Sequence, residues 1–573
     1  MGDEFNINLN NSVKFLKKNW NWIILLVIII IAWNYRAYHL DYPVIGYHNW
    51  KETHYLTEAR NFARDGFFAN GFFMPVWDYP GINTDPSGVH SDTFPTTSIL
   101  VGLGFKIFGY NLAVARTINI LMVLISIVLF YLIIKKLFDN EILALTATAL
   151  MAMNPLLIFF GRQVQLINTS LMFGMIGIYF YLKWLDDFSW SNTIMFSLAI
   201  IISVLTKYTF ALLVIPMIAI FPFKKLKEKK YWKKFIVIIV IALIGSLWIP
   251  YSVVDSSNNI QSQVTAVSIS KIFEKSFWSV MKSYAADNYT LLGVLLAGLG
   301  LALFLLNFNK NRSKAGYKFF LAYFIGSVFW FVVLSYKLSG HNYHQYPLVA
   351  LMVFLMAYLF MIVASTIGTF LASLIKLSKL KNIIKKTAIT IVILILLLVI
   401  HNPSMESKNR MFDTQFFGMD IAGSYINTHK LSGERVIHSS HQAYGLLWHG
   451  DIKGTAGIPN LEGIKYAEEN LNATWLFIYN WDFAKIATDR ERWNYIANNY
   501  ELVQTAFSVN QNQLTGLYYF LFKKGGSFNE TLFYEDGNLN VELFSNMLQG
   551  KPIQNWEYER SIDNPIIQYV NFK

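Results

Sequence analysis

The sequence predicts an α-helical polytopic membrane bundle of about 11 spans, followed by a separate water-facing C-terminal α/β domain. Of the 573 residues, 54% are hydrophobic and only 15% are charged, and the mean hydropathy is +0.36. Soluble domains carry about 25% charged residues. Apolar runs long enough to cross a hydrocarbon core recur through roughly the first 400 residues and then stop. These observations exclude a wholly soluble protein.

Eleven apolar runs are the expected spans. The first follows Lys14, Lys17 and Lys18 and has no small-residue cleavage site after it, so we expect a retained signal anchor. The chain has no cysteine, which excludes disulfides, thiolate metal sites and thiol nucleophiles. The expected spans are residues 20–38, 112–134, 141–160, 168–185, 191–206, 208–223, 233–250, 288–307, 316–335, 346–372 and 387–401.

Four lysine clusters predict the orientation, because basic loops stay on the cytoplasmic side. They fall near residues 135–136, 224–234, 310–318 and 376–386, all on the side of the N-terminus. With an odd number of spans, the chain is expected in the cell membrane with a cytoplasmic N-terminus and an extracytoplasmic C-terminal domain. Residues 402–573 carry 14 Lys and Arg against 19 Asp and Glu, a net charge of −5, so the membrane half carries +17 and the whole chain +12. That distribution favours membrane orientation over nucleic-acid binding.

Two domains follow from this pattern: residues 1–401 with a long outer loop at 41–112, and residues 402–573 outside the membrane. β-Branched and aromatic runs predict strands at 435–439, 474–479, 502–507 and 517–523. Helices are expected at 460–470, with Asn460 as the N-cap, and at 490–499.

Four cations interrupt the positive-inside pattern at the outer ends of spans: Arg116, Arg162, Lys207 and Lys337. Ionisable groups at membrane depth are costly and tend to mark functional paths. Several at one level can converge on an anion such as a phosphate, with Arg162 and Lys207 the best candidates. Snorkelling to lipid headgroups is the open alternative for each of them.

The outer loop offers carboxylates and imidazoles for acid–base chemistry. Glu52 lies between His48 and His54, beside Trp50, and a carboxylate in apolar surroundings suits general-base work. The alternative is a solvated helix with ordinary surface charges. Asp92 is a second carboxylate later in the loop, where Asp78 and Asp85 also lie and each alone is typical of a turn.

Polar aromatic residues open the tenth expected span, where His341, Tyr343 and His344 precede Pro347. They either line a pocket or form an interfacial aromatic belt. For metals, His438, His441 and His449 lack a tight ligand spacing, so no cofactor is expected with certainty and a divalent metal is possible but not indicated.

Several short motifs, together with the order in which they occur along the chain, resemble those of the GT-C glycosyltransferases. The resemblance is to the branch of protein O-mannosyltransferases and aminoarabinose lipid A transferases. The resemblance covers roughly residues 20–400. The motifs are Trp50-Lys51-Glu52-Thr53-His54-Tyr55 with Ala59-Arg60-Asn61, Asp92-Thr93-Phe94-Pro95, Gly161-Arg162-Gln163-Val164-Gln165, Leu205-Thr206-Lys207-Tyr208 and His341-Asn342-Tyr343-His344-Gln345-Tyr346-Pro347.

The resemblance implies transfer of a sugar from a polyprenyl-phosphate donor, such as a dolichyl phosphate sugar, to a protein, glycan or lipid outside the membrane, with inversion. It implies Glu52 as the base, with Asp92 and His54 as further catalytic residues, and His48 and Trp50 at the acceptor. Family loops often carry an Asp-Glu pair where this chain has Lys51-Glu52, and an acidic residue where it has Asn168. The residues implied at the donor and its phosphate are Arg162, Lys207, Arg116, Lys337, His341, Tyr343 and His344.

Two other classes stay open at this point. A lipid or sugar transporter or flippase predicts ionisable residues and broken helices near the bilayer midplane, often with paired internal repeats. A non-catalytic receptor or scaffold leaves the outer-end cations and the long first loop unexplained. The order of preference is enzyme, transporter, scaffold.

Overall fold

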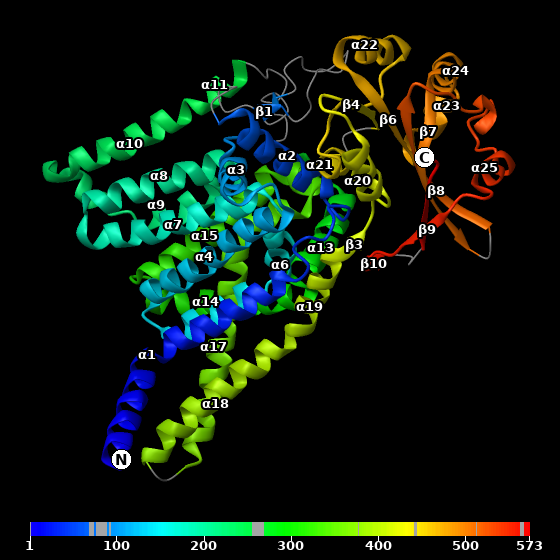
Figure 1. Cartoon of the computed structure of the whole chain (residues 1–573). Coiled ribbons are helices and arrows are strands. Elements are labelled where there is room, and N and C mark those ends of the chain that lie inside the picture. The colour runs from blue at the N-terminus through cyan, green and yellow to red at the C-terminus, as the bar shows by residue number, and fades with distance from the viewer. Residues whose placement is uncertain are drawn as a thin grey trace. The chain divides into compact units, whose positions relative to one another are not determined.

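The computed structural model describes residues 2–67, 74–75, 89–90, 93–254, 269–375, 378–439, 444–455, 457–510, 513–561 and 566–573. The chain forms two compact units (Figure 1). The membrane unit comprises residues 1–40, 91–97 and 116–408, and the sheet unit comprises residues 41–90, 98–115 and 409–573.

Residues 41–90 and 98–112 of the outer loop fall in the sheet unit and residues 91–97 fall in the membrane unit, whereas the sequence pattern predicted one membrane domain that included 41–112 and ended at 401. Ile45 is buried in the sheet unit's apolar core, against which Tyr42 and Trp50 also pack. The carbonyl of Ile45 accepts hydrogen bonds from the amides of Gln415 and Phe416. These long-range contacts tie the loop to the C-terminal residues.

The membrane unit is a bundle of helices (Figure 1). Its α-helices are α1 (Gly2–Ala37), α4 (Leu112–Phe138), α5 (Glu141–Ala152), α6 (Pro155–Arg162), α7 (Leu166–Asp187), α8 (Trp190–Thr206), α9 (Val214–Ala219), α10 (Trp232–Ser246), α11 (Trp248–Val254), α13 (Lys275–Tyr289), α14 (Leu291–Asn311), α15 (Ala315–Val333), α16 (Ser335–Gly340), α17 (Val349–Ser373), α18 (Ser378–Val399) and α19 (His401–Asn409). Short 3-10 helices connect them: η1 (Tyr208–Leu213), η2 (Phe223–Lys227), η3 (Lys229–Tyr231), η4 (Ser270–Phe273) and η5 (Asn342–Leu348).

Among the described residues, 8 helices are long and apolar enough to cross a membrane, or 9 if the bent pair α5–α6 is one span. These account for nine of the eleven expected spans. The other two, 191–206 and 208–223, are α8 and the run η1–α9, which are apolar but shorter. The polytopic helical fold is confirmed, and length alone supports fewer crossings than eleven.

The bend between α5 and α6 has a local cause. The Asn154 side chain accepts a hydrogen bond from the amide of Leu157 at 3.1 Å, and Pro155 occupies the first turn of α6. An Asn cap followed by Pro starts a new helix rather than continuing the old one. The two helices therefore meet at 55°, and α6 ends at Arg162.

One end of the membrane unit collects basic side chains; we call it the basic end. Asn21, near the start of the first span, donates to Tyr131 Oη at 2.9 Å and to Glu141 at 3.3 Å. Lys135, in the last turn of α4, forms an ion pair with Glu141, which begins α5. Lys136 pairs with Asp186 at the end of α7. The starts and ends of these helices alternate, as an up-and-down bundle requires.

The sheet unit contains a seven-stranded mixed sheet in the order β5-β4-β6-β8-β7-β11-β9 (Figure 1). β4 pairs in parallel with β5 and β6, and the other pairs are antiparallel. All four strands expected from the sequence are present as β4, β6, β7 and β8. The strands are β4 (Arg435–His438), β5 (Lys453–Gly454), β6 (Ala473–Tyr479), β7 (Tyr500–Asn510), β8 (Gln513–Lys524), β9 (Ile553–Trp556) and β11 (Ile567–Asn571), with the short pairs β1 (Met74–Pro75) with β2 (Val89–His90), and β3 (Asp413–Thr414) with β10 (Arg560–Ser561).

Helices cover both faces of this sheet, because side chains alternate along each strand. Trp475 and Phe477 of β6 join one apolar core, which includes residues of α20 and α21. Leu476 and Ile478 join the other, which includes residues of α22 to α25. The unit's helices are α2 (Asn49–Asp65), α3 (Thr96–Phe108), α20 (Met419–His429), α21 (Tyr444–His449), α22 (Leu461–Leu471), α23 (Phe483–Ala487), α24 (Arg490–Asn499) and α25 (Val541–Leu548); α3 begins two residues before the unit's boundary.

Asp420, in the first turn of α20, makes the stability of the sheet unit depend on pH. Burial raises the pKa of this carboxyl to about 6, although Tyr558 Oη donates to it at 2.7 Å. Between the unfolded value near 3.8 and pH 6 the native chain binds more protons, so this group's contribution falls as pH rises through that window. Asp420→Asn is expected to stabilise the protein by up to about 3 kcal/mol at pH 7.5, and hardly at all at pH 4.

Thermal unfolding of the full chain in detergent, followed by tryptophan fluorescence at pH 4 and 7.5, checks this expectation. The difference between Asp420→Asn and wild type removes the contribution of every other titrating group. A difference that is the same at both pH values would contradict the assignment.

Candidate functional site

Arg162 and Arg116 meet the chain that leaves α1, at the end of the membrane unit away from the basic end. Arg162 donates to the carbonyl of Tyr38 at 2.8 Å and to that of His39, whose φ is 46°. Arg116 donates to the carbonyl of Leu40 at 3.0 Å. Both guanidinium groups are almost fully buried. Their contacts hold the turn after α1, and a role at a donor phosphate stays a prediction for both.

A third arginine, Arg36, was not anticipated from the sequence. It is fully buried and donates to the carbonyls of Ala152 at 3.1 Å and Leu157 at 3.0 Å, one on each side of the α5–α6 break. Carbonyls near a helix break lack their usual partners, and a guanidinium supplies several donors at fixed angles. Arg36 therefore stabilises the bend that sets the position of Arg162.

Lys207 ends α8 and lies beside the aromatic run that precedes α17. Its Nζ is 5.8 Å from the ring centroid of Tyr343, in cation–π geometry. Tyr343 also stacks on His341, with centroids 5.2 Å apart and planes 11° apart, and lies 4.6 Å from the ring of His344. The structure thus brings together four of the predicted donor residues.

Lys207 and His341 are half-buried, whereas Tyr343 and His344 are buried. Lys337, the remaining cation of the predicted set, is half-buried on α16. α16 packs against η5, which carries Tyr343 and His344. A cation with neighbouring imidazole and phenol groups can bind an oxyanion through charge and hydrogen bonds.

Asn168 is the centre of a buried hydrogen-bond network at the break between α6 and α7. Its amide nitrogen donates to the carbonyls of Phe160 at 2.9 Å and Gln163 at 3.0 Å. Its oxygen accepts from Tyr346 Oη at 2.6 Å. Many members of the family that the chain resembles carry an acidic residue at this position. The side-chain amide of Asn168 both donates and accepts hydrogen bonds here, which an ionised carboxylate cannot do.

Replacing Asn168 by leucine is expected to destabilise the membrane unit by about 2–4 kcal/mol, because two carbonyls and a phenol lose buried partners. The measurement is thermal unfolding of the purified full chain in detergent. Asn311→Leu is the matched control, since Asn311 is half-buried at the end of α14 and its side chain donates to the carbonyl of Asn307 one turn earlier. Equal stability of the two variants would show that the network contributes nothing.

The first residues of α3 and the segment just before them are anchored to α8 and α7 within the membrane unit. The amide of Phe94 donates to the carbonyl of Leu205 at 3.0 Å. Thr96 and Thr206 share a hydrogen bond of 2.6 Å, and Thr97 and Thr169 share one of 2.7 Å. Two of the short motifs found in the sequence are therefore neighbours in space. Asp92 lies outside the described residues and its proposed role remains a prediction.

Glu52 lies on α2 of the sheet unit, in its first turn, and is only 2% exposed. The prediction that it lies in an apolar environment is consistent with the buried Tyr55, Leu56 and Ala59 on the same helix. The positive end of the helix dipole favours a carboxylate in this turn. Glu52 is therefore a buried carboxylate at the positive end of a helix dipole. Its catalytic role stays a prediction.

A second buried carboxylate on α2, Glu58, is engaged on both oxygens. His54 Nε2 lies 3.0 Å from its Oε1, and Ser98 Oγ of α3 donates to its Oε2 at 2.8 Å. His54 and Glu58 are four residues apart, and residues i and i+4 share a helix face, so this spacing could have indicated the pair in the sequence. His54 is thus paired with Glu58, and this pairing was not anticipated.

His48 and Trp50, the residues expected at the acceptor, begin the same helix. His48 has φ 59° and is the N-cap of α2, and its carbonyl accepts from the amide of Lys51 at 3.0 Å. Trp50 packs against the apolar core of the sheet unit, and Lys51 Nζ lies 4.1 Å from its ring centroid. Binding of an acceptor by either residue remains a prediction.

Arg60 joins α2 to α21 in the sheet unit. It lies 2.9 Å from the Asp451 carboxylate and stacks on Trp448, 5.4 Å from the ring centroid. Burial lowers the pKa of Arg60 to about 10, while the charge of Asp451 acts in the opposite direction. This pair fixes α2, and with it Glu52, on the sheet unit.

Metal binding has no cluster to support it among the described residues, where no group of three His, Cys, Asp or Glu side chains could hold an ion. His438 is buried, and burial lowers its pKa to about 4. Its Nδ1 lies 2.6 Å from the carbonyl of Ser439. His441 lies outside the described residues, and His449 accepts from the amide of Val44 at 3.3 Å.

Residues 91–252 match a family model described as dolichyl-phosphate-mannose-protein mannosyltransferase. The fold is similar to that of ArnT from Cupriavidus metallidurans bound to undecaprenyl phosphate, at 10% identity and a TM-score of 0.57, over 88% of this chain and 98% of that chain. For the apo state of ArnT the TM-score is 0.53 over the same shares, again at 10% identity.

A crystal structure of the Archaeoglobus fulgidus oligosaccharyltransferase in complex with Zn and sulfate is also similar, at 11% identity and a TM-score of 0.50, over 94% of this chain and 79% of that chain. No curated protein sequence matches the chain. The chain therefore has the fold of the GT-C glycosyltransferases, as the motifs led us to expect.

Proposed function

We propose that this chain is a membrane glycosyltransferase that moves a sugar from a polyprenyl-phosphate donor to a hydroxyl group on the outer face of the membrane. The observation that carries the proposal is the cluster of Lys207, His341, Tyr343 and His344 at the Arg162 end of a GT-C membrane unit. The family match over residues 91–252 supports it, because that range includes both Arg162 and Lys207.

The donor phosphate is assigned to this cluster by its chemistry. When the glycosidic bond breaks, the electron pair goes to the phosphate oxygen, and the leaving group is an anion that needs charge stabilisation more than protonation. Lys207 supplies the charge, with Lys337 and the histidines as further partners. Arg162 and Arg116, which hold the turn after α1, are the remaining candidates.

The acceptor hydroxyl is assigned to Glu52. Its carboxylate takes the proton from the hydroxyl as the oxygen bonds to the anomeric carbon. His54 and Asp92 are assigned supporting roles, and His48 and Trp50 are assigned to acceptor binding. Attack from the face opposite the phosphate inverts the anomeric centre. The acceptor class (protein, glycan or lipid) and the sugar are left to experiment.

The orientation is part of the proposal. The lysine clusters at the basic end are assigned to the cytoplasmic side of the cell membrane, and the sheet unit to the outside. A lipid or sugar transporter was the alternative. The similar solved structures are glycosyltransferases, so the likeness of fold does not favour that alternative.

The test uses the full chain in lipid nanodiscs with radiolabelled donors. Polyprenyl-phosphate sugars are compared with the corresponding nucleotide sugars, each with protein, glycan and lipid acceptors. The expected result is labelled acceptor from a lipid-linked donor alone. Product from nucleotide sugars alone would contradict the proposal, and so would no product from any donor and acceptor pair.

A further inference from the structure

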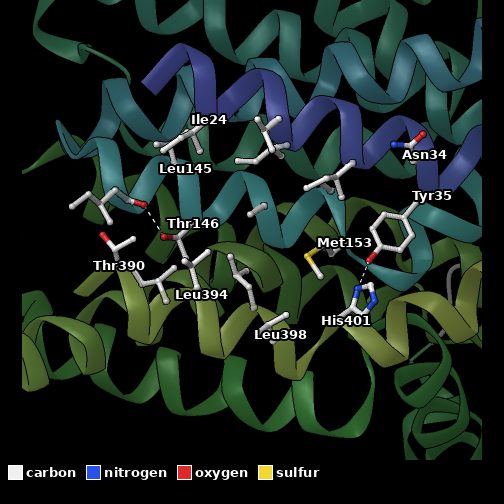
Figure 2. A pocket seen from close by; sticks show the side chains of 18 of the residues that line it. Ile24, Asn34, Tyr35, Leu145, Thr146, Met153, Thr390, Leu394, Leu398 and His401 are labelled. Carbon is white, nitrogen blue, oxygen red and sulfur yellow. Dashed lines mark hydrogen bonds between the residues drawn. The ribbon is translucent and has the colours of Figure 1, made fainter. Parts of the chain in front are cut away.

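A long groove of about 1260 Å³ lies within the membrane unit, between α1, α5 and α18. Figure 2 shows Ile24 and Tyr35 of α1 on one side, Leu145 and Thr146 of α5 between, and α18 with the start of α19 on the other side. None of the residues discussed for sugar transfer lines this groove. It therefore needs its own explanation.

The groove runs along the spans. On α1 its lining extends from Trp20 to Tyr35, and on the opposite wall from Lys386 on α18 to Lys408 on α19. Fifteen residues of α-helix rise about 22 Å, so both walls cover most of a hydrocarbon core of about 30 Å. The groove has the length and direction of a lipid chain in a bilayer.

The middle of the groove is aliphatic. Ile24, Leu145 and Leu394 are among its lining residues. The two hydroxyl groups there bond within their own helices: Thr146 donates to the carbonyl of Ile142 at 2.8 Å and Thr390 to that of Lys386 at 3.1 Å. Such a surface offers nothing to a polar ligand and packs well against hydrocarbon.

The two ends of the groove differ in charge. At one end, Tyr35 Oη and His401 Nδ1 lie 2.7 Å apart, as Figure 2 shows, and Lys408 Nζ lies 4.8 Å from the Tyr38 ring centroid. The polar groups of Tyr35, His401 and Lys408 thus already have partners within the protein. At the other end, beside Trp20, Lys386 is exposed, and in the part of the chain that the structure describes it forms no ion pair.

Lys386 is not alone at this end. Lys381 and Lys385 precede it on α18, and they too form no ion pair with any described residue. Clusters of lysines beside a groove between spans are a recognised binding site for anionic lipid headgroups. A Trp at the same level is typical of the membrane–water interface.

We propose that this groove binds an anionic phospholipid from the leaflet at the basic end, with its phosphate at Lys386 and its acyl chains along α1, α5 and α18. A zwitterionic lipid would leave the lysines without a counter-charge. The lipid packs between α1 and α18, where Tyr35 and His401 are already joined at the far end. This proposal does not depend on the proposed sugar transfer.

The test is native mass spectrometry of the delipidated full chain, titrated with phosphatidylglycerol or phosphatidylcholine. We expect phosphatidylglycerol to bind at least tenfold more tightly, and Lys386→Glu to weaken it by about tenfold or more, since each lysine near an anionic headgroup contributes roughly fivefold. Lys310→Glu, in the last turn of α14 and outside the groove, is the charge-matched control and should change binding less than twofold.

A second variant tests the groove without changing charge. Leu394 lines the groove and is exposed, so Leu394→Trp fills space without disturbing the core, and we expect it to reduce phosphatidylglycerol binding. Equal binding of the two phospholipids, or unchanged binding by Lys386→Glu, would overturn the proposal. Displacement of phosphatidylglycerol by undecaprenyl phosphate at equal concentration would also overturn it, and would assign the groove to the donor lipid.

Discussion

Lys207→Met is expected to lower the rate constant of sugar transfer by about 10²–10³-fold, because under the proposed function the departing phosphate then loses the cation assigned to it. Lys207 is half-buried and its Nζ contacts the Tyr343 ring, so methionine retains most of the side-chain packing. Single-turnover transfer with saturating polyprenyl-phosphate sugar separates this effect from weaker donor binding.

Two further variants serve as comparisons for the Lys207→Met result. Lys207→Arg keeps the charge and should retain more transfer than Lys207→Met. Lys314→Met is the control, since Lys314 is exposed just before α15 and belongs to the basic loops. Wild-type transfer by Lys207→Met would remove Lys207 from the phosphate site. A loss by Lys314→Met of equal size would indicate a general effect of charge.

Glu52→Gln is expected to lower transfer by about 10²–10⁴-fold while leaving donor binding unchanged, because the amide cannot take the acceptor's proton. The substitution preserves shape at a position that is 2% exposed. The measurement is the single-turnover transfer rate, together with the donor Kd. The rate should fall in Glu52→Gln while the donor Kd stays at the wild-type value.

Glu58→Gln is the matched variant, since Glu58 is buried on the same helix but is engaged by His54 and Ser98. It should lower thermal stability and retain transfer. Full transfer by Glu52→Gln, combined with loss of transfer but retained donor binding in Glu58→Gln, would assign the role of base to Glu58.

Local patterns were enough to predict most of the secondary structure. The apolar runs correspond to helices because each must bury its backbone polar groups inside the bilayer. The strand at 474–479 and the helix capped by Asn460 were recognisable from residue type alone, and Asn460 does accept from the amide of Gly463 at 3.0 Å. Short segments such as 208–223 were harder, because a Pro-containing 3-10 and α-helical run has the composition of a span without its length.

Contacts between distant residues were not predictable from such patterns. Composition placed the loop at 41–112 with its neighbouring spans, but burial of Ile45 and packing of Trp50 group residues 41–90 with the sheet unit. Arg162 was recognisable as a cation at the end of a span. Its partners, the carbonyls of Tyr38 and His39, depend on how α6 meets the end of α1.

The candidate site was predictable only in part, because residue types can be recognised in a sequence whereas contacts between distant residues cannot. Lys207 and the His341–Tyr343–His344 run were singled out by residue type, and the structure brings them together. Asn168 was noticed only as a departure from a resemblance. Its network with Phe160, Gln163 and Tyr346 exists only once α6, α7 and η5 have packed.

The most direct test of the central proposal is the stoichiometry of transfer in proteoliposomes that contain the purified full chain and a donor labelled in both the sugar and the lipid. A glycosyltransferase is expected to produce one polyprenyl monophosphate for each sugar that becomes bound to the acceptor, and Lys207→Met should reduce both products together. Movement of the intact donor across the bilayer, with no polyprenyl monophosphate released, would contradict the account and favour a transporter.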